Sequence, residues 1–320
     1  MRYCTLPTTD LTVSVLCLGS AHMGTRVSEV ASFRILDAFV DKGGTFIDTA
    51  RAYAVWVPGG EGASETLVGK WLHSRRHGDR VVVATKGGHP AWSSIETPRL
   101  SRDEIRQDCL ASRSALKIAT LPLYWLHRDD PLRPLEDIFS TMEDLRHRGY
   151  IRHYGFSNWS TERMRAAMSY AACHGLTGFV ANQPMWSYAE VNPAGIPDAT
   201  SYAMDADMAA FHREWNLPVV PYSAQAKGFF NKVAKAGFQG LDADLRAAYD
   251  NPLNRSRFDK LTRFARESGH NLAALALAWL VCQPDLRVIP VIWSADIAHL
   301  DEALQAGDLV LGREAVRSLA

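Results

Sequence analysis

The chain has 320 residues, 47% of them hydrophobic, and its 35 basic residues balance its 35 acidic ones. This hydrophobic share is ordinary for a globular protein, and zero net charge gives no electrostatic reason to expect a nucleic acid or membrane partner. Five cysteines without a C-x-x-C pair indicate reduced thiols, and no apolar run reaches the ~18 residues that span a bilayer. The N-terminus, MRYCTLPTT, lacks the apolar core of a signal peptide. We therefore expect a cytoplasmic protein.

Short apolar runs alternate with amphipathic windows along the whole chain. A hairpin is expected at the N-terminus, formed by residues 2–6 and 11–15. Strands are expected at residues 16–18, 45–48, 81–85, 121–126, 153–157, 178–182, 218–223 and 288–291. Helical windows lie at residues 27–42, 64–73, 101–116, 134–148, 161–174, 204–215, 258–268, 272–281 and 296–304.

Helix start and stop signals support these windows. Ser101-x-x-Glu104 reads as a capping box, Pro134 suits a first helical position, and Gly43, Gly149 and Gly175 stand where helices should end. Strands that alternate with helices predict a parallel sheet buried on both faces. The fold class expected is α/β, a single (β/α)₈ TIM barrel domain over residues 1–320, with an N-terminal β-hairpin. Residues 54–63, 87–100 and 224–255 are expected as long loops on its catalytic side.

Four polar residues stand at or just past the ends of the second, third and fourth expected strands. They are Asp48 and Tyr53 in GGTFIDTARAY, Lys86 in VVVATKGG and His127 in LPLYWLHRDD. Strand ends converge on one face of such a barrel. A phenol is a poor acid at neutral pH, but a cation beside it lowers its pKa. The pattern predicts a proton-donor site with Tyr53 as acid, Lys86 as its cation, Asp48 holding the lysine, and neutral His127 donating a hydrogen bond to a carbonyl.

These segments resemble the aldo-keto reductase family, and the resemblance runs from about Leu6 to Leu319. It implies NADPH-dependent reduction of aldehydes or ketones with Asp48, Tyr53, Lys86 and His127 as the catalytic tetrad. It also implies a cofactor bound across the barrel mouth. The residues implied to hold the nicotinamide are Ser157, Asn158, Gln183 and Tyr222, followed by Ser223, with Lys227 near the pyrophosphate.

The adenosine end departs from the family pattern. In VIPVIWSADIAHLDEAL, Ser294 and Glu302 fit, but Trp293 and Ala295 replace a small or basic residue and a frequent Arg. His299 stands where an Arg often binds the 2′-phosphate, a group that favours a guanidinium. NADPH is the family's usual cofactor. NADH use, weakened NADPH binding, or a lysine supplied by Lys227, Lys232 or Lys235 remain alternatives.

Aromatic residues in the loops suggest a small-molecule carbonyl substrate that is sugar-like or otherwise hydroxylated. Trp56, His89, Trp92 and Trp186 are the candidate substrate-binding residues, because aromatic faces stack on rings while polar groups bind hydroxyls. Each could instead pack a loop onto the barrel. No metal is expected.

Other functions remain open at this stage. The same barrel could serve as a non-catalytic nicotinamide sensor, as in the potassium-channel β subunits that the family includes, or as an NAD-dependent sugar dehydrogenase running in the oxidative direction. A lyase with a Schiff base on Lys86 is a further alternative, although a carboxylate at Asp48 would keep the ammonium charged. A metallohydrolase barrel lacks its His-x-His pair, since the first strand leads only into GSAH.

Overall fold

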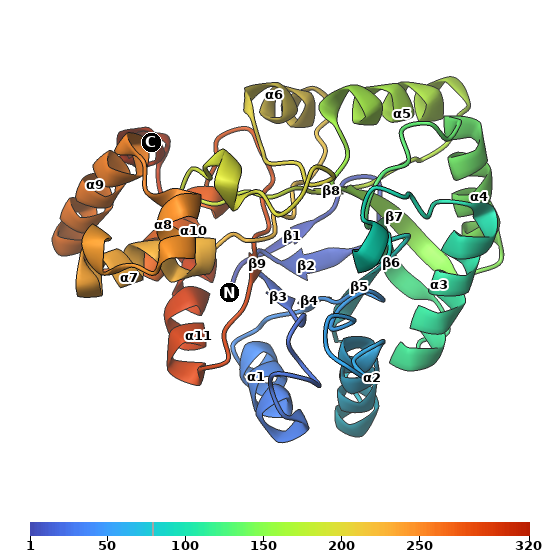
Figure 1. The fold of residues 1–320 in the computed structure, drawn as a ribbon, viewed down its shortest axis with the longest axis horizontal. Helices are drawn as coiled ribbons and strands as arrows, with labels where there is room; N and C mark the ends of the chain where they lie inside the picture. Colours follow the sequence, from blue (N-terminus) through green and yellow to red (C-terminus); the bar gives the residue numbers. More distant parts are fainter. Residues whose placement is uncertain (79) are drawn as a thin grey trace.

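A curled parallel sheet forms the centre of the protein (Figure 1). The computed structural model describes residues 1–78 and 80–320. Seven strands pair in the order β8-β7-β6-β5-β4-β3-β9. Their bounds are β3 Cys17–Gly19, β4 Phe46–Asp48, β5 Val82–Gly87, β6 Leu121–Leu126, β7 Ile151–Ser157, β8 Asn182–Gln183 and β9 Val291–Ile292. The predicted α/β TIM-barrel fold is confirmed.

The seventh expected strand, residues 218–223, does not form a regular strand. Val219 instead makes two isolated parallel bridges, to Asn182 on one side and to Val288 on the other. This run has proline at its first and fourth positions, and proline has no N–H to donate to a ladder. Backbone hydrogen bonds from Val219 to Arg287 (2.8 Å) and from Ile289 to Val219 (2.8 Å) nevertheless carry the pairing across this position. The eighth expected strand, residues 288–291, is displaced toward the C-terminus, because the regular strand there is β9, Val291–Ile292.

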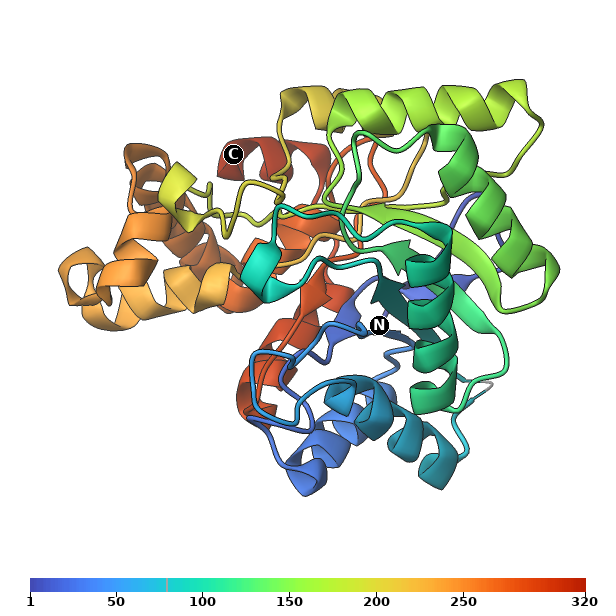
Figure 2. The ribbon, with the colours of Figure 1, turned by 45° about the vertical axis from the view of Figure 1, so that its right-hand side comes forward.

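Helices pack on the outside of the sheet, as Figures 1 and 2 show for α1 to α5. Those that match expected windows are α1 Glu29–Asp41, α2 Ala63–Arg75, α3 Arg102–Leu116, α4 Leu135–His147, α5 Thr161–Cys173, α6 Ala206–Glu214, α9 Pro252–Ser268, α10 Leu272–Val281 and α11 Ile297–Leu304. The capping box is confirmed, because Ser101 Oγ accepts from the Glu104 N–H and the Glu104 carboxylate accepts from the Ser101 N–H. No helix among the described residues is long and apolar enough to cross a membrane.

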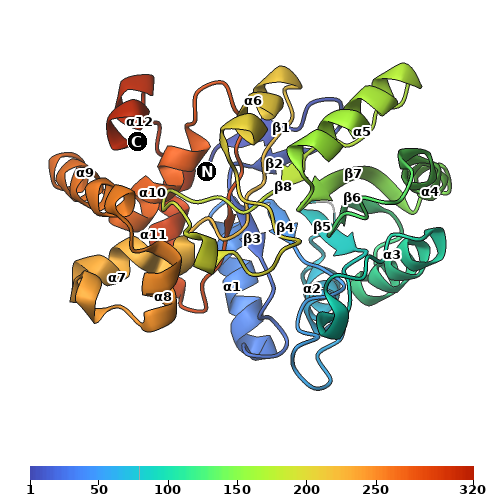
Figure 3. The same cartoon turned by 45° about the horizontal axis from the view of Figure 1, so that its top comes forward.

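The prediction of a loop over residues 224–255 was wrong. That stretch holds α7 Phe229–Ala236, α8 Ala243–Tyr249 and the start of α9, which group together beside α10 (Figure 3). A third unexpected helix, α12 Arg313–Leu319, ends the chain. Helices of seven or eight residues are marginal by themselves and depend on packing, which sequence periodicity does not report. In α7 that packing comes from Phe229, Phe230 and Val233, all buried.

The predicted N-terminal hairpin is present as β1 Tyr3–Thr5 paired antiparallel with β2 Thr12–Ser14. Leu6, Leu11 and Val13 next to or within it are buried against residues of the barrel interior, including Phe46 and Trp125. The hairpin therefore covers one end of the barrel. The carboxyl ends of the strands, where barrel enzymes place their sites, meet at the other end.

Candidate active site

Asp48, Lys86 and Tyr53 form one hydrogen-bonded group at the strand ends. Asp48 ends β4 and Lys86 lies one residue before the end of β5, so the parallel pairing of these strands brings the two side chains together. Lys86 Nζ forms an ion pair with the Asp48 carboxylate, and both side chains are 1% exposed. Lys86 Nζ also donates to Tyr53 Oη at 2.9 Å and to the Thr49 carbonyl at 2.9 Å. The lysine is thus held by three oxygens, one of them the phenol.

His127 lies beside this phenol, immediately after β6. Its ring is edge-on to Tyr53, with 6.0 Å between ring centroids. Burial, together with His89, Lys86 and Arg128, holds the pKa of His127 well below its usual value, so the imidazole is neutral. Within the described chain no side chain hydrogen-bonds to either ring nitrogen. A neutral imidazole without a protein partner can donate its N–H to a ligand.

The expected lowering of the Tyr53 pKa is not what the structure gives. Burial raises the pKa of Tyr53 well above its ordinary value, and the nearby Asp48 carboxylate raises it further. Burial also lowers the pKa of Lys86, against the opposing effect of Asp48. In this arrangement the phenol carries its proton at neutral pH. A proton donor has to be in that state before reaction.

Arg128, the residue after His127, was missed by the sequence reasoning. Its side chain is 8% exposed and lies 3.5 Å from the carboxylate of Asp198. Arg128 Nη1 donates to the His127 carbonyl at 3.1 Å, and Arg128 Nε donates to Thr200 Oγ1 at 2.9 Å. The guanidinium therefore links the backbone of the candidate histidine to the segment after β8. The available signal was a cation next to the histidine in LHRDD.

The candidate nicotinamide residues lie at the ends of β7 and β8 and at Tyr222. Tyr222 Oη donates to Asn158 Oδ1 at 2.8 Å, and Asn158 Nδ2 donates to Ser157 Oγ at 3.2 Å. Gln183 Nε2 donates to the Asp48 carboxylate at 3.1 Å. Gln183 therefore adjoins the Asp48–Lys86 pair directly, and Ser157, which donates to the Gln183 carbonyl at 3.1 Å, connects Asn158 and Tyr222 to it.

A cleft of about 780 Å³ runs from Tyr53 along α7 and α11. It brings together the sequence-predicted residues Tyr222, Ser223, Lys227, Ser294, His299 and Glu302. Lys232 and Lys235 of α7 line it as well. The cleft therefore joins the phenol to a wall of hydroxyl groups and cations.

Similarity to known proteins identifies the family of this chain. The model of the family described as "Aldo/keto reductase family" matches residues 15–320. The chain belongs to the aldo/keto reductase family. Among its relatives, an uncharacterized oxidoreductase, YrpG, of Bacillus subtilis is 29% identical, covering 100% of this chain and 95% of that protein. Norsolorinic acid reductase B of Aspergillus parasiticus is 27% identical over 98% of this chain and 81% of its own length. A putative aryl-alcohol dehydrogenase, AAD14, of Saccharomyces cerevisiae is 24% identical over 98% and 84%.

Aldo/keto reductases generally use NAD(P)H. Ser223, Gln225 and Ser294 offer hydrogen-bonding groups along the cleft. Gln225 Oε1 also accepts from the Trp293 N–H at 2.7 Å, which fixes the chain after β9 against the opposite wall. The lysines of the cleft supply positive charge for phosphate groups. The donor set therefore suits a polyanionic nucleotide.

Three of the four candidate substrate residues of this aldo/keto reductase form a row of rings. Trp56 is edge-on to Trp92 at 5.7 Å, Trp92 lies 5.0 Å from His89, and His89 lies 4.7 Å from His127. The row leads from the loops to the candidate catalytic histidine. Trp186 does not join it, because its ring packs edge-on against Trp279 at 5.9 Å.

Proposed function

We propose that this aldo/keto reductase reduces an aldehyde or ketone to the alcohol, with NAD(P)H as hydride donor and Tyr53 as proton donor. The observation that carries the proposal is the buried Asp48–Lys86–Tyr53 group, which ends in a protonated phenol beside the neutral imidazole of His127. An acid and a second hydrogen-bond donor that converge on one point suit a carbonyl oxygen.

The residues divide the reaction between them. The substrate oxygen lies between Tyr53 and His127, and His127 donates a hydrogen bond that favours negative charge on that oxygen. NAD(P)H, when bound, would supply the hydride that the carbonyl carbon accepts. Tyr53 gives its proton to the oxygen, and the O–H bond of the alcohol forms as that of the phenol breaks. Lys86 stabilises the phenolate left behind, and Asp48 keeps Lys86 charged and in place.

We infer that NADPH is the preferred cofactor. Ala295 and Trp293 offer no charge to a 2′-phosphate, and His299 is the sole basic residue of its stretch. Lys232 and Lys235 line the same cleft as Ser294 and His299, which supports their taking the role of the missing arginine. NADH stays the alternative if these lysines do not reach the phosphate.

The substrate is proposed to be sugar-like or otherwise hydroxylated. The row of Trp56, Trp92 and His89 beside His127 supports this, because aromatic faces next to polar groups suit hydroxylated rings. A non-catalytic nicotinamide sensor would not need the hydrogen-bonded Asp48–Lys86–Tyr53 group with His127 beside it. A Schiff base on Lys86 would require a neutral amine, which the ion pair with Asp48 opposes.

The Tyr53→Phe variant tests the proposal. Loss of the phenol proton should lower kcat for carbonyl reduction by ~10² to 10⁴, the usual contribution of a general acid. The Kd for NADPH should stay within about twofold, since the ring remains in place. Both are measured by following NADPH absorbance and by titrating tryptophan fluorescence. Turnover near that of the unaltered protein would rule out Tyr53 as the donor.

A further inference from the structure

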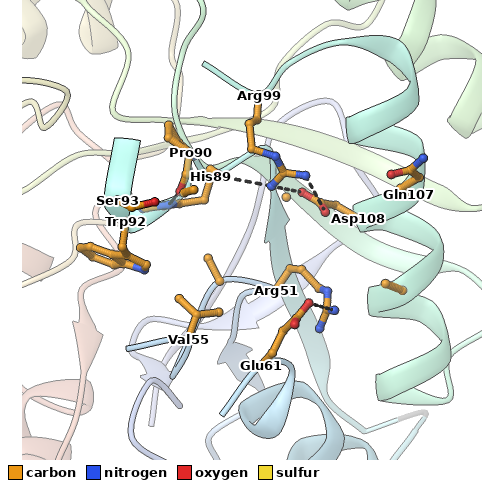
Figure 4. A pocket seen from close by; sticks show the side chains of 14 residues that line it. Arg51, Val55, Glu61, His89, Pro90, Trp92, Ser93, Arg99, Gln107 and Asp108 are labelled. Atoms are coloured by element: carbon orange, nitrogen blue, oxygen red, sulfur yellow. Dashed lines mark hydrogen bonds and ion pairs between the residues drawn. The ribbon is translucent and has the colours of Figure 1, made fainter. Parts of the chain in front are cut away.

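Figure 4 shows a second cavity, of about 630 Å³, which shares no lining residue with the cofactor cleft. We call it the outer cavity. Arg51 and Glu61 come from the loop after β4, His89 and Trp92 from the loop after β5, and Arg99 from the segment before α3. His89 connects it to the active site, because its ring lies 4.7 Å from that of His127. The His89 ring therefore stands between the outer cavity and the candidate catalytic histidine.

The charges that line the outer cavity balance. Arg51 pairs with Glu61 at 2.5 Å, and Arg99 pairs with Asp108 at 3.4 Å (Figure 4). An anionic group placed here would face the carboxylates as well as the guanidinium groups. The lining has no excess positive charge with which to hold a carboxylate or a phosphate. A neutral ligand fits this balance better.

The hydrogen-bonding groups of the outer cavity include both an acceptor and donors. His89 Nδ1 lies 2.6 Å from the Pro90 carbonyl, and a carbonyl only accepts, so Nδ1 carries the hydrogen. Burial lowers the pKa of His89 to about 4, which leaves the ring neutral and Nε2 an acceptor. The Arg51 guanidinium makes its side-chain hydrogen bond to Glu61 through Nη2 and has further N–H groups to give. A hydroxyl group can donate to the first and accept from the second.

An aromatic surface completes the outer cavity. Trp92 is 51% exposed, and its ring lies against that of His89 at an interplanar angle of 32°. A large exposed indole beside donors and acceptors suits a ring that has apolar C–H faces and hydroxyl groups at its edge.

We propose that the outer cavity binds a neutral polyhydroxylated ring, such as a glycosyl group, that forms the part of the substrate remote from the reacting carbonyl. The inference rests on the proposed carbonyl reduction and adds to it the class of the remote group and the residues that select it. Arg51, His89 and Trp92 are its specificity-determining residues.

The test compares three benzaldehydes that share a reacting group and differ at the para position. They are 4-formylphenyl β-D-glucoside, the apolar 4-propoxybenzaldehyde and the anionic 4-formylphenoxyacetate. We expect the highest kcat/KM for the glucoside. The Arg51→Met and Trp92→Leu variants should each lower the glucoside-to-propoxy ratio of kcat/KM by roughly 3- to 10-fold, the effect of one or two lost contacts. Arg106→Met is the matched control, because Arg106 is an exposed neighbour on α3 outside the cavity lining, and the ratio should not change in it.

Binding without turnover separates this inference from the proposed function. Saturation-transfer NMR with the glucoside alcohol, 4-(hydroxymethyl)phenyl β-D-glucoside, should show contact through the sugar protons, and Trp92→Leu should weaken it. Sugar contact without reduction of any aldehyde would support the cavity and count against the enzyme. Reduction of all three aldehydes at equal rates, a preference for the anion, or variants with an unchanged ratio would overturn the inference and leave the enzyme standing.

Discussion

Arg128 shows how much a single buried cation can matter at this site. It donates to the His127 carbonyl and contributes positive potential at Tyr53, where it opposes the effects that raise the pKa of the phenol. A cation near the phenol also stabilises the phenolate that forms when the proton leaves. Arg128 is therefore expected to act through Tyr53 and His127 as a positioning residue.

Replacing Arg128 gives a prediction with a pH signature. Arg128→Met should lower kcat by roughly 10-fold or more, because both the charge and the link to Thr200 are lost. In the oxidative direction, where Tyr53 must accept a proton, the pH at which activity rises should move upward, since a higher phenol pKa delays formation of the phenolate. Arg128→Lys keeps the positive charge, so its pH profile should return closer to that of the unaltered protein than its kcat does.

Arg163→Met serves as the control for this prediction. Arg163 binds the carbonyls of Asp130 and Arg133 on the same loop but makes no hydrogen bond to Tyr53 or His127. Its variant should keep the pH profile. If Arg128→Met lowers kcat and the melting temperature together but leaves the pH profile of activity unchanged, Arg128 only stabilises the fold.

At the residue scale, the sequence predicted which groups meet but not their electrostatics. The placement of Asp48, Lys86 and His127 followed from strand ends, because parallel strands bring their carboxyl ends together. The direction of the Tyr53 pKa did not follow, since it is set by burial, which emerges only from packing. Trp186 failed to join the other aromatic residues for the same reason.

At the scale of elements, the longer helices α3 and α9 were predicted, whereas the short α7 and α8 were missed. α3 begins with a capping box, and α9, although it starts earlier than expected, ends at Gly269 with φ 74°. α7 and α8 are short and were read as loop. The proline-containing run of residues 218–223 was read as a strand because its apolar residues suggest one, while the missing N–H groups of its two prolines leave isolated bridges in place of a continuous ladder.

His212 on α6 provides a prediction about how one helix is attached to the barrel. The residue is 1% exposed, its Nδ1 bonds to the Leu217 carbonyl at 2.8 Å, and its Nε2 accepts from Asn182 Nδ2 of β8 at 3.1 Å. Burial lowers its pKa to about 4. Protonation would place an N–H against the amide N–H of Asn182, so the folded protein resists it.

The sign of the resulting pH dependence follows from linkage. The unfolded imidazole takes a proton below a pKa of ~6.5, whereas the folded one does not until about 4. The contribution of this imidazole to the free energy of unfolding is therefore at its full value above pH ~6.5. It is lost as the pH falls toward 4, by at most ~1.4 kcal/mol per pH unit. Urea unfolding of His212→Gln at several pH values should show lower stability at pH 7 and a shallower decline between pH 6.5 and 4. An identical decline in both proteins would assign the effect to other groups, of which His89 is the first to test.

At the scale of the whole molecule, the cofactor cleft joins segments that are far apart in the sequence. Its lining residues come from the end of β3 (Gly19), from Tyr222, from α7 and from α11, and the unexpected α7 supplies Lys232 and Lys235. The sequence marked the adenosine stretch at Trp293, Ala295 and His299 as unusual. It could not show whether a lysine from elsewhere reaches the same cleft, because that depends on how α7 packs.

The last prediction concerns cofactor choice. A 2′-phosphate carries close to two negative charges at neutral pH, and a hydrogen bond to a charged group contributes ~1.5–3 kcal/mol. If the lysines of α7 bind this group, the Lys232→Ala/Lys235→Ala double variant should raise the Kd for NADPH about 10-fold or more and that for NADH less than about twofold. Lys227→Ala should weaken both cofactors alike if Lys227 contacts the pyrophosphate that they share. Titration of tryptophan fluorescence measures all of these, with Lys260→Ala on α9, outside the cleft lining, as the control.

Equal losses for both cofactors in the double variant would place α7 at the pyrophosphate. If the double variant binds both NADPH and NADH as tightly as the unaltered protein, α7 takes no part in cofactor recognition. His299 would then be the residue to replace next.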